Sequence, residues 1–155
     1  MQIRRFKDED GVELAKVIEK TLRITNAQDY SPEYIEDIVR AMSSENLIAR
    51  NAWTHFYVAC EDERIIGCGA IGPYYSKEDE SCFFTIFVLP EYQGRGVGRK
   101  IVETLERDPY FLRAKRIEIP ASISAVEFYK KMGYSYKNGI YSIDEEQLCR
   151  MEKFR

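Results

Sequence analysis

Histidine is nearly absent from this chain, since His55 is the only one among 155 residues. A zinc site built on histidine is therefore not expected. The four cysteines, Cys60, Cys68, Cys82 and Cys149, include no C-x-x-C pair, and three of them lie in apolar runs typical of strands. We expect buried, reduced thiols rather than metal ligands or disulfides, and we expect no metal.

The sequence also lacks a large charge of either sign and a long apolar run. The formal net charge of -3 argues against a nucleic-acid binder, whose affinity would come from neutralising phosphates. No apolar run approaches the length of a membrane span, and residues 1–5 are followed by charges instead of the apolar core of a signal peptide. We expect a cytoplasmic protein with no membrane partner, folded as a single domain over residues 1–155.

The most informative stretch present is residues 82–108. Seven mostly apolar residues, 83–89, are followed by Pro90 and predict a buried strand. A glycine-rich loop follows at residues 94–98, and apolar residues then recur at helical spacing. The predicted helix ends at Asp108-Pro109, because proline cannot continue a helix. This stretch therefore predicts a strand, a glycine loop and a helix.

The predicted loop has the chemistry of an anion site. Its glycines tolerate positive φ, and the first N–H groups of the following helix have no partner within that helix. Arg95, Arg99 and Lys100 add positive charge, which suits a phosphate or pyrophosphate. A tight turn with solvated arginines explains the same residues and stays open. The loop lacks the ending of a Walker A motif, and Arg99 stands where a dinucleotide fingerprint has its last glycine.

Periodicity predicts the remaining elements. Helices are expected at about residues 12–22, 32–42 and 122–132, and strands at residues 2–6, 53–60, 64–71 and 116–120, with two or three short closing strands within 134–136, 140–143 and 148–154. A charged turn at residues 61–63 predicts an antiparallel hairpin, and the strand, helix and strand over 83–119 predict a parallel, right-handed crossover.

Two motifs resemble one known family. Residues 93–98, QGRGVG, directly follow a strand that ends V-x-P-E-Y, and this resembles the coenzyme A pyrophosphate loop of the GNAT superfamily of N-acetyltransferases. Residues 122–134 are similar to the family's N-x-x-A-x-x-x-Y-x-x-x-G-F/Y segment, although Ser122 replaces its usual asparagine. The resemblance extends to the order of elements over nearly the whole chain. It implies an α/β (α+β) fold of the GNAT acyl-CoA N-acyltransferase type, with a central mixed, mostly antiparallel sheet of about six or seven strands flanked by four helices.

The resemblance also implies where acetyl-CoA, the expected cosubstrate, would bind. The sheet should open between strands 83–89 and 116–120, and the pantetheine arm should enter that gap and pair with the strand backbone. The cofactor-binding residues implied in this way are Phe87, Val88, Gln93, Gly94, Arg95, Gly96, Val97, Gly98, Arg99, Ser122 and Tyr129.

The expected reaction is direct attack by a primary amine on the acetyl thioester in a ternary complex, because no set of nucleophile, base and acid is evident. By resemblance, Val88 N–H is the oxyanion donor and Tyr129 the catalytic acid, although Tyr129 also fits a packed core aromatic. Glu80 is the candidate catalytic base. Glu78, Asp79 and Cys82 compete for that role, and a solvated acidic turn remains the alternative.

The implied function is therefore transfer of an acetyl group from acetyl-CoA to the amine of a small molecule or peptide. A non-catalytic or regulatory coenzyme A-binding module and an enzyme for longer acyl groups stay open as alternatives. In the family, acceptor contacts come from the stretches that correspond to residues 22–30 and 73–81. A homodimer through the closing strands is a further hypothesis. Candidate acceptor contacts are Asp29, Tyr30, Tyr74, Tyr75 and Glu78.

Overall fold

The computed structural model describes residues 1–155 and contains one seven-stranded sheet with the strand order β1-β2-β3-β4-β5-β7-β6. Only the β4–β5 pair is parallel. The predicted mixed, mostly antiparallel sheet is therefore confirmed, including the parallel crossover. The strands are β1 (Gln2–Arg5), β2 (His55–Glu61), β3 (Arg64–Pro73), β4 (Glu80–Val88), β5 (Arg116–Ala121), β6 (Ser135–Tyr136) and β7 (Cys149–Phe154).

Six α-helices surround the sheet, two more than predicted. They are α1 (Gly11–Ile24), α2 (Pro32–Ala41), α3 (Ser44–Asn51), α4 (Val97–Leu105), α5 (Pro109–Leu112) and α6 (Val126–Lys131). The additional helices are α3 and α5, and each begins at a side-chain cap: Ser43 Oγ accepts from Asn46 N–H, and the Asp108 carboxylate accepts from Tyr110 N–H. The Asp108-Pro109 pair thus begins a short helix, while α4 already ends at Leu105.

Two predictions near the C-terminus need correction. The helix expected over 122–132 is a 3-10 turn at Ile123–Ala125 followed by the shorter α6. Residues 140–143 form no strand and contribute only an isolated bridge between Ile143 and Cys149. None of the helices is long and apolar enough to cross a membrane.

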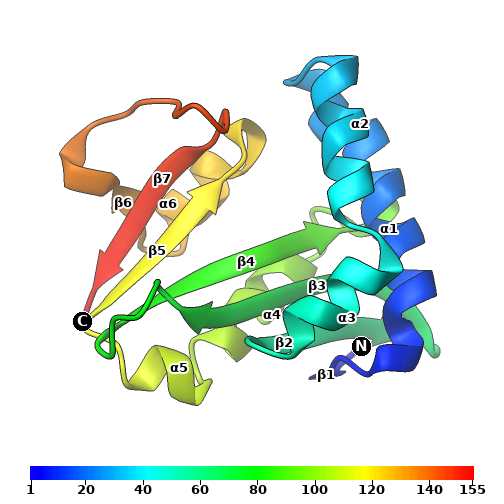
Figure 1. Ribbon diagram of the computed structural model, residues 1–155, viewed down its shortest axis with the longest axis horizontal. Helices are drawn as coiled ribbons and strands as arrows, with labels where there is room; N and C mark the ends of the chain where they lie inside the picture. Colours follow the sequence, from blue (N-terminus) through cyan, green and yellow to red (C-terminus); the bar gives the residue numbers. More distant parts are fainter.

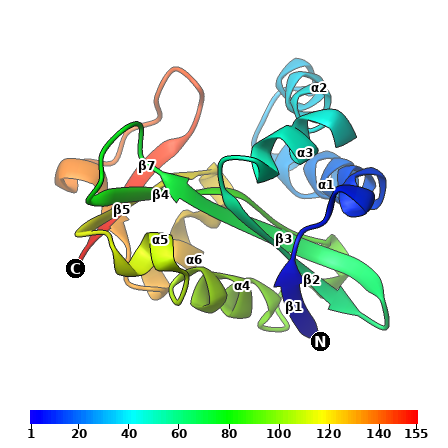
Figure 2. The same ribbon diagram turned by 60° about the horizontal axis from the view of Figure 1, so that its bottom comes forward.

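The helices form two layers. Helices α1, α2 and α3 cover one face of the sheet, and α4, α5 and α6 cover the other (Figure 2). Helix α4 approaches β3 closely because β3 carries glycine there: a Cβ on Gly69 would lie 2.6 Å from the Ile101 side chain. This contact fixes α4, and with it the glycine loop that precedes it, against the centre of the sheet.

The sheet is split along part of its length. Strands β4 and β5 pair only where Glu80–Cys82 meets Arg116–Glu118, and from there they diverge (Figure 1). Strand β4 keeps its β3 partner as far as Val88, whereas β5 pairs with β7. The predicted opening between these two strands is therefore present, and β4 has a free edge along it.

Candidate active site

The free edge of β4 presents backbone polar groups to the opening. Leu89 N–H donates to Ile66 C=O on β3 (2.8 Å). Since successive residues of a strand direct their N–H groups to opposite edges, Val88 N–H faces the edge without a strand partner. Val88 C=O accepts a hydrogen bond from the Gln93 side-chain amide (2.9 Å). Gln93 therefore closes the end of the free edge where the loop begins.

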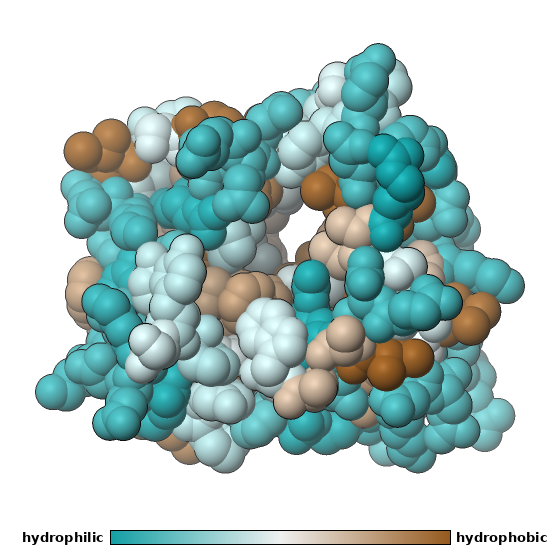
Figure 3. Space-filling view, in the orientation of Figure 1, coloured by the Kyte–Doolittle hydropathy of each residue, from teal (hydrophilic) through white to brown (hydrophobic).

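An opening lies beside this edge. The space-filling view shows a passage through the molecule between the β5–β7 side and helices α1 and α2 (Figure 3). Tyr30 joins the two sides: its hydroxyl donates to Gln147 C=O (2.8 Å) and accepts from Ile123 N–H (3.1 Å). Tyr30, predicted as an acceptor contact, thus has a structural role in bridging the opening.

The loop after β4 adopts the predicted backbone. Gly94 has φ +77° and Gly96 φ +83°, and nothing lies within 4 Å of a Cβ built on either, so both positions require glycine for conformation and leave open space. Gly96 precedes the first turn of α4 and accepts from Lys100 N–H (3.1 Å), while the N–H groups of Val97 and Gly98 begin the helix. Together they form a helix N-terminus suited to an anion.

Gly98 and the loop arginines differ from the first two glycines. A Cβ on Gly98 would lie 3.3 Å from the Phe128 ring, so this glycine provides close packing between α4 and α6. The guanidinium of Arg95 lies over the Tyr92 ring at 5.2 Å. Neither Arg95 nor Arg99 forms an ion pair within the protein, and both charges remain available to a ligand.

Tyr129 lies in α6, on the face of the sheet that carries α4. It is 5% exposed and packs edge-on against the rings of Phe128 and Tyr134. Its hydroxyl makes no hydrogen bond within the protein, and burial raises the pKa of Tyr129 above its ordinary value of 10.0. Burial therefore favours the protonated phenol. Ser122, nearby in sequence, begins the 3-10 turn, and its side chain makes no capping bond.

Glu80 and Val88 lie at opposite ends of β4. It lies at the first residue of β4, where its carboxylate pairs with Arg116 (2.9 Å) and Lys77 (3.3 Å). Val88 is eight positions further along the strand, which is a span of roughly 25 Å. This position favours a structural role for Glu80.

The competing candidates for the base are also poorly placed. Burial, followed by the charge of Glu118, raises the pKa of the Cys82 thiol to about 12, so Cys82 remains a neutral thiol. Glu78 and Asp79 are exposed in the turn before β4. The structure therefore places Val88 and the glycine loop at the free edge of β4, and it places none of these candidates for the base along that edge.

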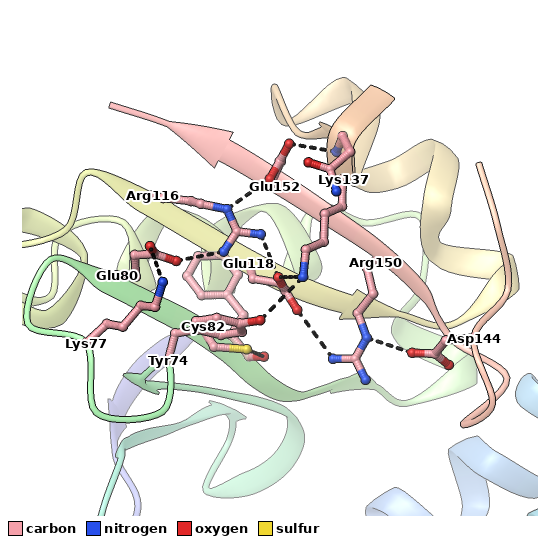
Figure 4. A network of polar contacts seen from close by, with 12 residues as sticks. Tyr74, Lys77, Glu80, Cys82, Arg116, Glu118, Lys137, Asp144, Arg150 and Glu152 are labelled. Atoms are coloured by element: carbon pink, nitrogen blue, oxygen red, sulfur yellow. Dashed lines mark hydrogen bonds and ion pairs between the residues drawn. The ribbon is translucent and has the colours of Figure 1, made fainter. Parts of the chain in front are cut away.

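A buried network that the sequence analysis missed occupies the closed end of the opening (Figure 4). Glu118 on β5 has a side chain that is only 2% exposed, and it pairs with Arg116 (2.6 Å), Lys137 (2.9 Å) and Arg150 (3.5 Å). Burial acts to raise the pKa of Glu118, but hydrogen bonds from Arg116 and Lys137 outweigh it and hold the pKa below its ordinary value. A glutamate inside the apolar run at 116–121 was the available signal in the sequence.

The predicted acceptor contacts do not converge. Tyr74 joins the network at the closed end, where its hydroxyl accepts from Lys137 Nζ (3.3 Å). Asp29, Tyr75 and Glu78 are exposed. Arg50 of α3, whose guanidinium donates to the Thr85 hydroxyl on β4, also had no signal in the sequence.

Known proteins resemble this chain in sequence and in fold. A family model described as "Acetyltransferase (GNAT) domain" matches residues 52–136. The N-acetyltransferase YafP of Escherichia coli (strain K12), itself uncharacterized, is 25% identical over 137 residues, with 86% of this chain and 81% of YafP covered.

Solved structures share the fold over most of the chain. The PaiA N-acetyltransferase of Thermoplasma acidophilum, in complex with coenzyme A, has a TM-score of 0.81 at 22% identity and covers 99% of this chain and 98% of its own. A GNAT family acetyltransferase of Brucella melitensis, in complex with acetyl-CoA, has a TM-score of 0.65 at 25% identity. The match covers 86% of this chain and 82% of the Brucella chain. Because the family model spans more than half of the 155 residues, the chain belongs to the GNAT acetyltransferase family.

Proposed function

We propose that this protein transfers an acetyl group from acetyl-CoA to a primary amine of a small molecule or peptide. The observation that carries the proposal is the free edge of β4, which leads directly into the glycine loop at the start of α4. A backbone edge and a helix N-terminus in line suit a ligand that has an amide-bearing arm and a phosphate end. The coenzyme A and acetyl-CoA bound in the two similar structures support the same cosubstrate here.

The loop would hold the diphosphate. The backbone N–H groups of residues 94–98 are the donors, and Arg95 and Arg99 supply charge without an internal partner. The pantetheine arm would follow the free edge at Phe87 and Val88, with Ser122 on the opposite side of the opening. This arrangement fits the positive φ values of Gly94 and Gly96 and the empty space above them.

The reaction forms one bond, breaks another and transfers a proton to the leaving sulfur. The amine nitrogen attacks the thioester carbonyl carbon, the new C–N bond forms, and the C–S bond breaks. Val88 N–H donates to the carbonyl oxygen as negative charge develops there. Tyr129 donates its phenolic proton to the leaving sulfur and regains a proton from the attacking nitrogen, so the enzyme ends unchanged.

An alkylamine is protonated at neutral pH and must lose one proton before attack. Since Glu80 is held by Arg116 and Lys77, we propose that water in the opening accepts this proton. Holding the neutral amine against the thioester would then be the main contribution to the rate.

Two measurements on the purified protein test the proposal. Titration calorimetry with coenzyme A should give saturable binding, and release of free thiol from acetyl-CoA should depend on an added amine. Binding without amine-dependent thiol release from any member of a broad panel would favour the alternative of a regulatory coenzyme A-binding module. Absence of coenzyme A binding would exclude both the acetyltransferase and the regulatory module. Release from longer acyl-CoA thioesters in the same assay measures the acyl-chain preference.

A further inference from the structure

Arg50 differs from the other buried or half-buried arginines in having no acidic partner. It lies in the last turn of α3, half-buried against the sheet. Its Nη1 donates to the Thr85 hydroxyl and lies 3.9 Å from Met42 Sδ. Arg116, by contrast, pairs with three carboxylates. A thioether and one hydroxyl leave most of the five donors of Arg50 unused.

The charge of Arg50 is not compensated from any other side. Burial lowers the pKa of Arg50, and Cys68 is the titratable neighbour that acts on it. Burial in turn raises the pKa of Cys68 to about 12, so that thiol is neutral. A guanidinium partly removed from water without a counter-ion is unfavourable, and a bound anion would relieve this cost.

The contact with Thr85 places Arg50 on the strand that lines the opening. Thr85 has φ +56°, and the β3–β4 register shifts between Cys68 and Ala70, which identifies a bulge. Pairing with β5 ends at Cys82, so Thr85 lies within the free part of β4, three residues or about 10 Å from Val88. Bulges commonly redirect a side chain beside an active site.

Arg50 and Tyr129 belong to helices on opposite faces of the sheet, with the free edge of β4 between them (Figure 2). Trp53, which follows α3 three residues after Arg50, is 48% exposed and packs edge-on against Phe84 of β4 at 5.1 Å. Arg50 and this aromatic pair thus lie on the α1–α3 face of the sheet and contact the part of β4 that has no β5 partner.

We propose that Arg50 binds a carboxylate of the acceptor, so that the acceptors are primary amines that also carry a carboxylate, such as amino acids. The planar guanidinium matches a carboxylate in bidentate geometry. This inference rests on the proposed function and specifies the substrate class of the same site.

A purely structural role for Arg50 predicts different behaviour. If Arg50 only held the bulge through Thr85, then Arg50→Gln and Thr85→Val would impair all acceptors alike. If Arg50 binds the acceptor, Thr85→Val leaves the preference for a carboxylate in place, while Arg50→Gln removes it.

The experiment compares matched pairs of acceptors that differ only in the carboxylate. Each acid is assayed beside its amide: glycine, phenylalanine, 4-aminobutyrate and 6-aminohexanoate, which also varies the distance between amine and carboxylate. Wild type should prefer at least one acid over its amide. Arg50→Gln should lower kcat/KM for that acid by a factor of about 10 to 100, leave its amide unchanged, and leave the Kd of coenzyme A unchanged. Arg40→Gln removes an exposed cation of α2 and is the matched control, with no expected change.

An equal loss for acids and amides in Arg50→Gln, or a wild type without preference for any acid, would overturn the inference. The Tm provides a readout that does not require turnover, so it also detects acceptors that bind without being acetylated. The acids and their N-acetyl derivatives should raise the Tm of wild type in the presence of coenzyme A, and should not raise that of Arg50→Gln. Absence of any such rise in the Tm of wild type would also overturn the inference. Failure of the proposed function is seen separately, as absent coenzyme A binding and absent thiol release.

Discussion

The two ends of β4 differ in their partners and in their charges. At the Glu80 end, β4 pairs with β3 and β5, and acidic and basic side chains neutralise one another in the buried network around Glu118. At the Val88 end, β4 pairs with β3 alone. Arg50, which contacts Thr85, and the loop residues Arg95 and Arg99 form no ion pairs within the protein.

This difference separates what the fold needs from what a ligand would supply. The closed end satisfies its own backbone and charges, so it can hold the diverging strands together without a ligand. The open end leaves a strand edge and positive charges without partners, and negatively charged ligands with amide groups would complete it. Substitutions at one end test whether the other end is affected.

The largest effect is expected from Tyr129→Phe, because Tyr129 is proposed to act on the ligand bound at the open end. Removing the proposed proton donor should lower kcat by about 1,000-fold, within the range for general acid catalysis. Stability and the Kd of coenzyme A should change little, because the Tyr129 hydroxyl makes no hydrogen bond within the protein. Thiol release and calorimetry on the same preparation measure the two quantities.

The pH dependence of wild type gives a second check on Tyr129. Because burial raises its pKa above 10.0, the phenol stays protonated through the alkaline range in which a free tyrosine would ionise. We expect no fall in kcat attributable to Tyr129 up to about pH 10. Wild-type turnover in Tyr129→Phe would rule out Tyr129 as the catalytic acid.

The next effect is expected at the closed end, from Glu118→Gln. The substitution leaves Arg116, Lys137 and Arg150 without the carboxylate that they share, and should lower the free energy of unfolding by about 3 kcal/mol. Urea denaturation at pH 7 measures this loss. The exposed pair of Arg23 and Glu36 provides the control, since Glu36→Gln should leave the free energy of unfolding nearly unchanged.

The same carboxylate should contribute to acid sensitivity. The pKa of Glu118 in the folded protein lies below its ordinary value of 4.5. Its stabilisation is therefore complete above about pH 4.5 and is lost as the pH falls through the folded pKa. Wild type should lose more stability than Glu118→Gln between pH 5 and pH 3. Parallel losses in the two proteins would show that the charge of Glu118 does not stabilise the closed end.

A smaller effect is expected from Gly96→Ala in the loop. At φ +83°, alanine is strained by about 1 to 2 kcal/mol, so stability should fall slightly and the Kd of coenzyme A should rise by about tenfold as the loop relaxes. Gly139 has φ +72° and equally open surroundings, far from the loop in sequence. Gly139→Ala should lose similar stability without a change in Kd. A rise in Kd for both variants would indicate a general rather than a local effect.

Local patterns allowed the sequence to predict much of the fold. The alternation of strands and the charged turn predicted the β2–β3 hairpin, whose turn residues Asp62 and Glu63 both have positive φ. The glycine loop and Tyr129 lie in short, contiguous motifs that carry their own signal. Helix α3 was missed because it is only eight residues long and buries a single residue, Leu47.

The residues missed at the site depend on contacts between distant segments. Arg50 meets Thr85 across 35 residues, and the bulge at Thr85 occurs in an ordinary strand sequence. Glu118 meets Arg150 only because β5 and β7 pair. Glu80 was selected because it is close to the central strand in sequence, but the direction of β4 places it at the closed end.

The smallest effect on catalysis is expected from Glu80→Gln, which tests that placement. Glu80 pairs with Arg116, which retains Glu118 and Glu152, so the variant should lose about 1 kcal/mol of stability. Since the carboxylate lies at the closed end, kcat should stay within about twofold of wild type and the pH–rate profile should not shift. A profile whose acidic limb moves in Glu80→Gln would restore Glu80 as the base, and would mean that the two ends of β4 are not separate in function.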